Sequence, residues 1–252
     1  MNTVQSFYDQ LAEAYHLIFE DWDRSIARQS AALHDILQQR RVSSDSTLLD
    51  AAVGIGTQAL GLARCSYHVT GADISIRALA RARREAVARS LSLSLVAADF
   101  RRLPFRSGSF AAVIACDNAL PHLLSIGEIR NALEEMQRCA QPGGAVLLSM
   151  RDYALPPASG TIEHRPYGER EWNGRRYLAE QEWRWNGPTY QLVMRIQSLE
   201  NADERIEVET TYLAVSVSTV LGLMSEVGLQ SVQRIDNVYY QPLLVGTVSR
   251  AE

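Results

Sequence analysis

The segment from Thr47 to Ala59 reads as an apolar strand, a glycine-rich turn and the first turn of a helix. Gly54 and Gly56 allow the backbone to bend sharply and to approach a ligand where a Cβ atom would clash. The helix expected at 58–64 would point its free N–H groups and the positive end of its dipole towards that ligand. The segment therefore predicts an α/β fold with a site for a nucleotide-like ligand.

Two kinds of nucleotide ligand fit this turn. Residues 54–59 match the dinucleotide pattern G-x-G-x-x-G/A, and Asp73 follows Gly54 by 19 residues, where a ribose-binding carboxylate is expected. Asp50, however, ends the strand before the glycines, where a carboxylate would repel a pyrophosphate. The same carboxylate could help to place a cationic ligand such as a sulfonium with an α-amino group. The sequence therefore favours S-adenosyl-L-methionine, and NAD remains the weaker alternative.

Strands and helices alternate along residues 45–157. Apolar strands are expected at 48–49, 68–73, 93–96, 110–116 and 145–149. Helices are expected at 25–39, 58–64, 77–89 and 128–139, the last of them ended by a Gln-Pro-Gly-Gly turn at 141–144. This alternation predicts a doubly wound parallel sheet.

The pattern changes after Met150. Longer strands are expected at 163–172, 176–185, 189–200 and 206–214, which predicts an antiparallel insertion rich in Trp and Arg at about 158–214. A helix at 218–227, with a candidate N-cap in the Ser218/Thr219 region, and strands at 230–235 and 243–248 complete the chain. A late helix followed by a hairpin suits a sheet with one antiparallel strand.

The first 25 residues are rich in aromatic side chains. The three- and four-residue spacing of five apolar positions predicts an amphipathic helix, and these positions are Tyr8, Leu11, Tyr15, Ile18 and Phe19. Such a helix is either a docking element or a lid over the ligand crevice, because enzymes often exclude water with peripheral segments.

Composition narrows the class of protein. With 252 residues and 46% hydrophobic content, the chain can bury a full core, and its net charge of −4 argues against a nucleic-acid partner. The three cysteines have neither disulfide-framework nor metal-site spacing. Because we find no signal pattern and no apolar run of about 18 residues, we expect a cytoplasmic protein without a membrane segment.

These features together resemble the class I S-adenosylmethionine-dependent methyltransferases. The general markers are Asp50, Gly54, Gly56, Thr57, Asp73, Asp99 and Pro142 to Gly144. A closer resemblance, to the glycine and glycine/sarcosine N-methyltransferases, rests on three further stretches: 15–22 with Arg28, 116–123, and 151–153.

The resemblance implies a fold. We expect a seven-stranded Rossmann-like α/β sheet with an antiparallel insertion after the fifth strand, in a single methyltransferase domain that spans 1–252. Its parts would be an N-terminal helical lid at 1–40, a cofactor-binding core at 45–157, the insertion at 158–214, and a C-terminal helix and hairpin at 215–252.

The resemblance also implies the residues that hold the cofactor. Ala52 and Gly54 would line its methionine end, Asp73 would take both ribose hydroxyls, and Asp99 with Phe100 would hold adenine. The remaining members of the cofactor set would be Tyr15, Arg28 (on the cofactor carboxylate), Asp50, Gly56, Ile74, Cys116 and His122.

On the substrate side, the resemblance implies that Asn118 faces the amine and that Arg151 binds the substrate carboxylate. Tyr8 is the best candidate for the lid tyrosine. Arg151 could instead form an ion pair with Asp152 or with another acid of the insertion, and His122 could be a structural histidine. An in-line methyl transfer needs mainly alignment and desolvation, so we expect neither a metal nor a nucleophilic triad.

The activity expected from the resemblance is methyl transfer from S-adenosyl-L-methionine to the amine of a small carboxylate-bearing substrate such as glycine or sarcosine, with S-adenosyl-L-homocysteine as product. Two alternatives stay open. The first is a larger specialised metabolite, whose pocket Trp172, Trp183 and Trp185 would shape. The second is a non-catalytic S-adenosylmethionine-binding module. The insertion could equally serve as the interface of a homo-oligomer.

Overall fold

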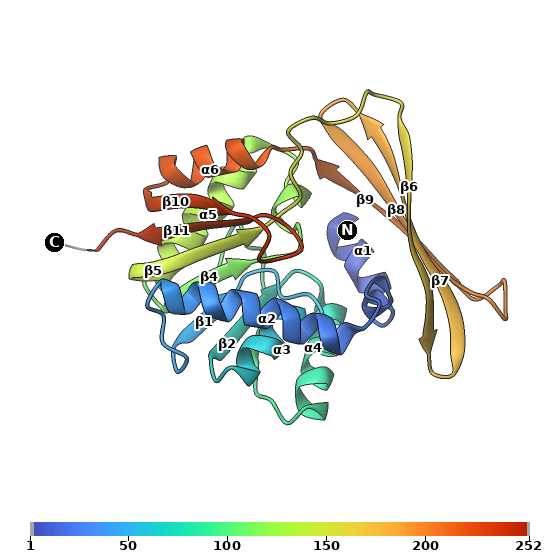
Figure 1. Ribbon diagram of the computed structural model, residues 1–252, viewed down its shortest axis with the longest axis horizontal. Coiled ribbons are helices and arrows are strands. Elements are labelled where there is room, and N and C mark those ends of the chain that lie inside the picture. Colours follow the sequence, from blue (N-terminus) through green and yellow to red (C-terminus); the bar gives the residue numbers. More distant parts are fainter. Residues whose placement is uncertain (1–2, 251–252) are drawn as a thin grey trace.

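The computed structural model describes residues 3–250, which form two separate β-sheets (Figure 1). The larger sheet has seven strands in the order β10-β11-β5-β4-β1-β2-β3. These strands are β1 (Thr47–Asp50), β2 (His68–Asp73), β3 (Ser94–Ala97), β4 (Phe110–Ala115), β5 (Ala140–Ser149), β10 (Leu229–Ile235) and β11 (Leu243–Val248). Strand β11 runs antiparallel to both of its neighbours, β5 and β10, and the other neighbouring strands pair in parallel. The predicted Rossmann-like sheet with one antiparallel strand is confirmed.

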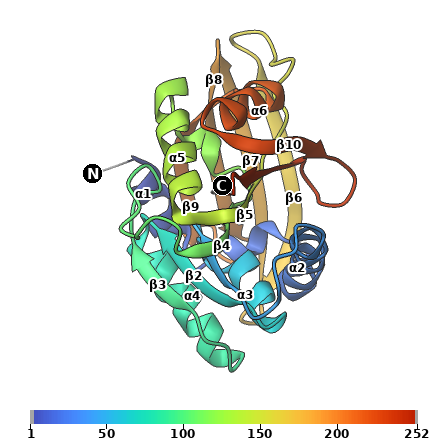
Figure 2. The ribbon, with the colours of Figure 1, turned by 90° about the vertical axis from the view of Figure 1, so that its left-hand side faces the viewer.

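Helices cover both faces of this sheet (Figures 1 and 2). They are α2 (Trp22–Gln39), α3 (Thr57–Arg64) and α4 (Ile76–Ala88) on one face, and α5 (Ile126–Cys139) and α6 (Val217–Glu226) on the other. Successive side chains of a strand point to opposite faces. Leu48 and Leu147 therefore pack towards α2 and α3, whereas Leu49 and Leu148 pack towards α5 and α6.

Side-chain caps fix where several helices begin. The Asp21 carboxylate accepts a hydrogen bond from the Arg24 backbone N–H at 2.9 Å, so α2 begins at Trp22, before the predicted start at Ser25. The Ser216 hydroxyl accepts from the Thr219 N–H at 3.1 Å. The cap of α6 is thus Ser216, and the prediction of the Ser218/Thr219 region was wrong by two residues.

The Gln-Pro-Gly-Gly segment does not stand between α5 and the next strand. It lies within β5, which begins directly after the helix at Ala140. The register shifts from the pair Phe110–Ala140 to the pair Ala112–Ala145, so residues 141–144 bulge out of the ladder. The predicted turn is therefore an irregularity at the start of the strand.

The insertion forms the second sheet. Its four antiparallel strands, in sheet order, are β6 (Ile162–Trp172), β7 (Arg175–Asn186), β8 (Thr189–Ser198) and β9 (Arg205–Leu213). This confirms the predicted antiparallel insertion after β5. In Figure 1 it stands beside the larger sheet, with the N-terminal helix between the two.

The N-terminal segment is not the single helix that its spacing predicts. Helix α1 (Thr3–Leu11) ends early, and a short 3₁₀-helix, η1 (Tyr15–Ile18), follows. The Ala14 and Leu17 N–H groups bond to carbonyls three residues back, which tightens the chain between the two helices. Helix α1 packs against β9 and α4.

None of the helices within residues 3–250 combines the length and the apolarity needed to cross a bilayer. The segments predicted at 1–40 and 215–252 also include residues 1, 2, 251 and 252, which lie outside the described part of the chain.

Candidate active site

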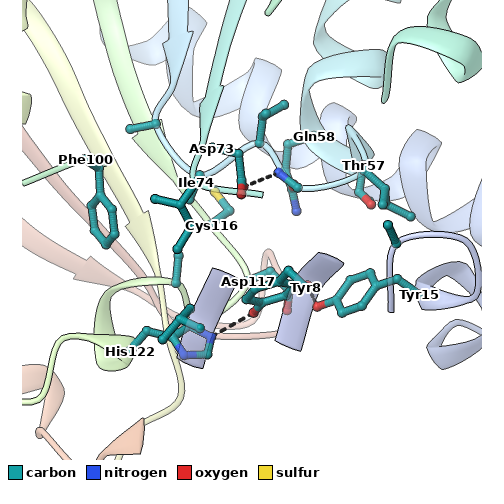
Figure 3. Close-up of a pocket in the computed structure, with 18 of the residues that line it drawn as sticks. Tyr8, Tyr15, Thr57, Gln58, Asp73, Ile74, Phe100, Cys116, Asp117 and His122 are labelled. Atoms are coloured by element: carbon teal, nitrogen blue, oxygen red, sulfur yellow. Dashed lines mark hydrogen bonds between the residues drawn. The ribbon is translucent and has the colours of Figure 1, made fainter. Parts of the chain in front are cut away.

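A cavity lies at the carboxyl ends of β1, β2 and β4, where open α/β sheets bind their ligands (Figure 3). We call it the strand-end cavity. Its wall is formed by loops that follow the strands and by the N-terminal segment, and it includes Val4, Tyr8, Ala12, Tyr15, residues 51–55, Thr57, Gln58, Asp73, Ile74, Ala98, Phe100, Cys116, Asp117, Ala119 and His122.

The two glycines of the turn serve different purposes. Both adopt a positive φ, +52° at Gly54 and +97° at Gly56, which favours glycine. A Cβ atom on Gly54 would enter open space, and Gly54 lines the cavity. A Cβ atom on Gly56 would come within 3.3 Å of Leu60 and 3.4 Å of Ala82. Gly54 thus keeps space open for a ligand, whereas Gly56 lets α3 approach α4.

Asp73 ends β2 beside the glycine turn. Its carboxylate accepts hydrogen bonds from the backbone N–H groups of Gly54 and Ser75, each at 2.8 Å. Burial raises the pKa of Asp73, and these two bonds oppose the shift. Each carboxylate oxygen keeps a further lone pair, so Asp73 can still accept hydroxyl donors from a ligand.

The N-terminal segment closes the cavity from the opposite side (Figure 3). A hydrogen bond of 2.8 Å joins the Tyr8 hydroxyl and Nε2 of His122, which belongs to the short helix η2 (Leu120–His122). Burial lowers the pKa of His122 to about 3, with a smaller contribution from the Arg151 charge. The His122 ring is therefore neutral at physiological pH and a weak base.

Asp117 follows β4 directly and adopts a positive φ of +58°. Its N–H donates to the Ser149 hydroxyl at 2.8 Å. Its carboxylate accepts from the Tyr15 hydroxyl at 3.3 Å and from the Tyr240 hydroxyl. Burial raises the pKa of Asp117, and the Tyr240 hydroxyl, the Arg151 charge and the Tyr15 hydroxyl oppose the shift.

A second cavity, of about 620 Å³, lies between the end of β5, the insertion and the loop before β11. We call it the insertion cavity. Aromatic rings form much of its wall: Tyr153, Tyr167, Trp183, Trp185 and Tyr212. Tyr15 and Asp117 line both cavities, so the two meet at these residues.

Arg151 brings a half-buried positive charge to the insertion cavity. Its guanidinium carbon lies 4.9 Å from the centre of the Trp183 ring, and that of Arg165 lies 3.8 Å from the same centre. No carboxylate of residues 3–250 forms an ion pair with Arg151 within 4.0 Å. The alternative pairing with Asp152 is wrong, because Asp152 pairs with Arg234 instead.

Comparison with known proteins identifies a methyltransferase domain within the chain. Residues 48–144 match the methyltransferase domain family. The chain is similar to a glycine/sarcosine N-methyltransferase of Halorhodospira halochloris, 29% identical over 161 residues that cover 62% of this chain and 58% of that protein. It is also similar to a demethylmenaquinone methyltransferase of Clavibacter sepedonicus, 30% identical over 159 residues that cover 61% and 59%. The chain thus spans less than two thirds of either relative.

The fold agrees with the family match. The structure resembles that of an S-adenosylmethionine-bound amino pentose methyltransferase from Micromonospora echinaspora, with a TM-score of 0.75, 19% identity, and coverage of 94% of this chain and 95% of that one. Residues 48–144 form a class I S-adenosylmethionine-dependent methyltransferase domain. The cofactor of this domain is S-adenosyl-L-methionine.

The strand-end cavity of the methyltransferase domain fits that cofactor. Open space at Gly54, free lone pairs on Asp73 and the apolar wall of Ile74, Ala98 and Phe100 suit a ribose and a flat base. Of the residues predicted to hold the cofactor, those that line this cavity are Tyr15, Ala52, Gly54, Asp73, Ile74, Phe100, Cys116 and His122. Tyr8, predicted on the substrate side, lines it as well.

Other predicted cofactor residues lie elsewhere. The Asp50 side chain is 1% exposed, and its Oδ2 atom is buried without a hydrogen-bond partner. Gly56 packs against α4, as described above. Arg28 is exposed on α2 and lines the insertion cavity. The Asp99 carboxylate is bound by the Arg101 guanidinium, which holds the pKa of Asp99 below its usual range despite partial burial.

Asn118 is also engaged within the protein. Its side-chain N–H donates to the Tyr153 hydroxyl at 3.0 Å, and its carbonyl oxygen accepts from the Arg151 backbone N–H at 2.9 Å. Both polar ends are thus used to hold the start of the segment after β5. Asn118 positions Arg151 and Tyr153 in this structure and does not present a free amide to the insertion cavity.

Sequence reasoning left Asp117 without a role. Asp117 and Asn118 follow β4 together, and both adopt a positive φ. The sequence places an acid and an amide at the ligand-binding edge of the sheet, but only the backbone shows which of them faces the cavities. Tyr167 and Tyr212 were missed for a related reason, since their places depend on how the insertion packs.

Proposed function

We propose that the chain transfers a methyl group from S-adenosyl-L-methionine to the amine of a small molecule that carries a carboxylate. The observation that carries this proposal is the unpaired guanidinium of Arg151 in the insertion cavity. A guanidinium matches a carboxylate with two parallel hydrogen bonds, and a hydrogen bond to a charged group contributes about 1.5–3 kcal/mol. A charge that is partly removed from water and has no ion-pair partner is costly, and a substrate anion would supply the partner.

The strand-end cavity would hold the cofactor. Asp73 would accept the ribose hydroxyls, Ile74 and Phe100 would contact adenine, and Ala52 and Gly54 would line the methionine end. When bound, the cofactor supplies a methyl group on a sulfonium centre whose sulfur leaves as a neutral thioether. The protein's own part is to align the acceptor and to exclude water. Helix α1 and η1 would serve the second task, because Tyr8 and Tyr15 line the cavity.

A larger acceptor than glycine is a second candidate, and a specific observation favours it. Trp183 and Trp185 line the insertion cavity, whereas Trp172 packs against His16 and Tyr177. The cavity volume of about 620 Å³ falls within the range of about 300–1,000 Å³ in which proteins bind drug-sized ligands. The names of the relatives point both ways, to glycine/sarcosine and to amino pentose substrates.

Calorimetry tests the proposal. The protein would first be titrated with S-adenosyl-L-homocysteine, and the complex then titrated with glycine, sarcosine, β-alanine and 4-aminobutyrate. We expect at least one amino acid to bind the wild type, and to bind Arg151→Ala at least tenfold more weakly. Arg205→Ala, which removes an exposed arginine of β9, is the matched control and should bind as the wild type does.

Each result leads to a decision. An amino acid that binds and is methylated supports the proposal, and the length of the preferred acceptor separates glycine from the larger class. If S-adenosyl-L-homocysteine binds but no amino acid does, a carboxylate-bearing acceptor is refuted. Binding of an amino acid without turnover would instead identify a non-catalytic binding module.

A further inference from the structure

We propose that Asp117 receives the substrate amine: its carboxylate binds the ammonium group and accepts the proton that the nitrogen must lose before it can take a methyl group. This inference rests on the proposed function, because it assigns the amine end of the same acceptor. It concerns a residue to which the sequence analysis assigned no role.

The position of Asp117 carries the inference. The reacting nitrogen must lie where the acceptor's cavity meets the cofactor's cavity. Of the residues that line the strand-end and insertion cavities, Tyr15 and Asp117 belong to both. Tyr15 supplies a hydroxyl that already donates to Asp117. Of these two residues, Asp117 is the one that carries a carboxylate, and it lies at the junction of the two cavities.

The charges around Asp117 match an ammonium ion. Its two hydrogen-bond donors are neutral hydroxyls. One belongs to Tyr15 of η1 and the other to Tyr240 in the loop between β10 and β11. No cation of residues 3–250 forms an ion pair with its carboxylate within 4.0 Å. No cation of the protein thus neutralises this carboxylate, and its free lone pairs can accept a further donor.

Arg151 supplies the positive charge of the insertion cavity. It also lines the insertion cavity, and its charge opposes the burial-driven rise in the pKa of Asp117 although the two side chains form no ion pair. The insertion cavity therefore has a negative group beside the cofactor cavity and a positive group against Trp183. This arrangement fits a zwitterion whose amine and carboxylate lie apart, with the aromatic wall contacting the part between them.

The proton transfer is balanced. An N–H bond of the ammonium breaks, its electron pair stays on nitrogen as the lone pair, and an O–H bond forms on Asp117, which later releases the proton to water. Burial favours this step because it raises the pKa of the Asp117 carboxyl. His122 is a poor alternative base, since its Nε2 atom is bound to the Tyr8 hydroxyl and its pKa is lowered to about 3.

The test compares amino acids with the same molecules lacking the amine. The complex with S-adenosyl-L-homocysteine would be titrated with the pairs β-alanine and propionate, and 4-aminobutyrate and butyrate. Asp117→Asn is the variant of choice, because asparagine tolerates the positive φ at this position. Glu134→Gln, which removes a negative charge from the exposed face of α5, is the matched control.

We expect the amino forms to bind the wild type and Glu134→Gln at least tenfold more tightly than their amine-free partners, and this preference to vanish in Asp117→Asn. Turnover with the preferred amine should fall about 10²- to 10⁴-fold in Asp117→Asn, the range for a lost acid–base group. S-adenosyl-L-homocysteine should still bind, which shows that the variant is folded.

The outcomes separate this inference from the proposed function. If the amines are bound and methylated by Asp117→Asn as by the wild type, the role of Asp117 is refuted and the methyltransferase function stands. Equal binding of amino and amine-free forms to the wild type also refutes it, without any variant. If the wild type neither binds nor methylates any of the amines, the proposed function falls and the role of Asp117 falls with it.

Discussion

Asp50 should make the stability of the ligand-free protein depend on pH. Its side chain is 1% exposed, its Oδ1 atom accepts one long hydrogen bond of 3.4 Å from the Ala52 N–H, and its Oδ2 atom has no partner among residues 3–250. Burial without adequate hydrogen bonds disfavours the charged form. The pKa of Asp50 rises from its ordinary 3.8 to about 7, mainly through burial and to a lesser degree through the nearby charge of Asp73.

The sign of the effect follows from the two pKa values. Below about pH 4 the Asp50 carboxyl is protonated in the folded and the unfolded chain, so it has no effect on the free energy of unfolding. Between about pH 4 and pH 7 the unfolded chain loses this proton while the folded protein keeps it, so stability falls as pH rises. The shift from 3.8 to about 7 corresponds to roughly 4 kcal/mol, fully expressed above pH 7.

The assay is urea unfolding of the wild type and Asp50→Asn at about pH 5 and about pH 8, without cofactor. The variant should gain stability relative to the wild type by roughly 3 kcal/mol between the two pH values. Asp35→Asn, at an exposed position of α2, should show no such change. A difference between wild type and Asp50→Asn that is the same at both pH values would refute the reasoning, whatever its size.

Three further changes have defined outcomes. Gly54→Ala should lower the free energy of unfolding by about 1–2 kcal/mol, because alanine is strained at a φ of +52°, and should weaken binding of S-adenosyl-L-homocysteine in calorimetry, because its methyl group enters the strand-end cavity; unchanged affinity would contradict this. Tyr8→Phe removes the 2.8 Å hydrogen bond to His122 and should lower the free energy of unfolding by about 1 kcal/mol in urea, whereas an unchanged value would mean that the bond contributes nothing. Ser216→Ala should destabilise the protein by about 1 kcal/mol through the lost cap of α6, while Ser218→Ala should have a much smaller effect on the thermal midpoint; the reverse order would restore the Ser218/Thr219 prediction.

The strands of the larger sheet could be predicted because their signal is local. The segments 68–73 and 243–248 were predicted as strands with the bounds that β2 (His68–Asp73) and β11 (Leu243–Val248) have in the structure. The break between α1 and η1 has no comparable signal, since Ala12, Glu13 and Ala14 are compatible with a helix. It depends on distant contacts: Glu13 pairs with Arg81 and Arg84 of α4.

The candidate site likewise contains residues that could be placed from the sequence and residues that could not. Asp73 and Phe100 could be placed beside the glycine turn because each follows a strand whose end meets that edge of the sheet. Whether Asp117 or Asn118 faces the cavities could not be predicted from the sequence. Both residues adopt a positive φ, which changes the directions in which adjacent side chains point. The contact between Asp99 and Arg101 could not be predicted either, because the sequence does not show which partner the carboxylate of a loop residue will bind.

The placement of the indole rings gives each cavity its own optical signal. Trp22 donates a hydrogen bond of 2.9 Å to the hydroxyl of Thr57, which lines the strand-end cavity, while Trp183 and Trp185 line the insertion cavity. Intrinsic fluorescence therefore reports on both compartments without a label. In a protein with Trp172→Phe, Trp183→Phe and Trp185→Phe, Trp22 is the one tryptophan left and its emission would follow the nucleoside alone, so the order in which the two ligands enter could be read from the unmodified protein and this variant side by side.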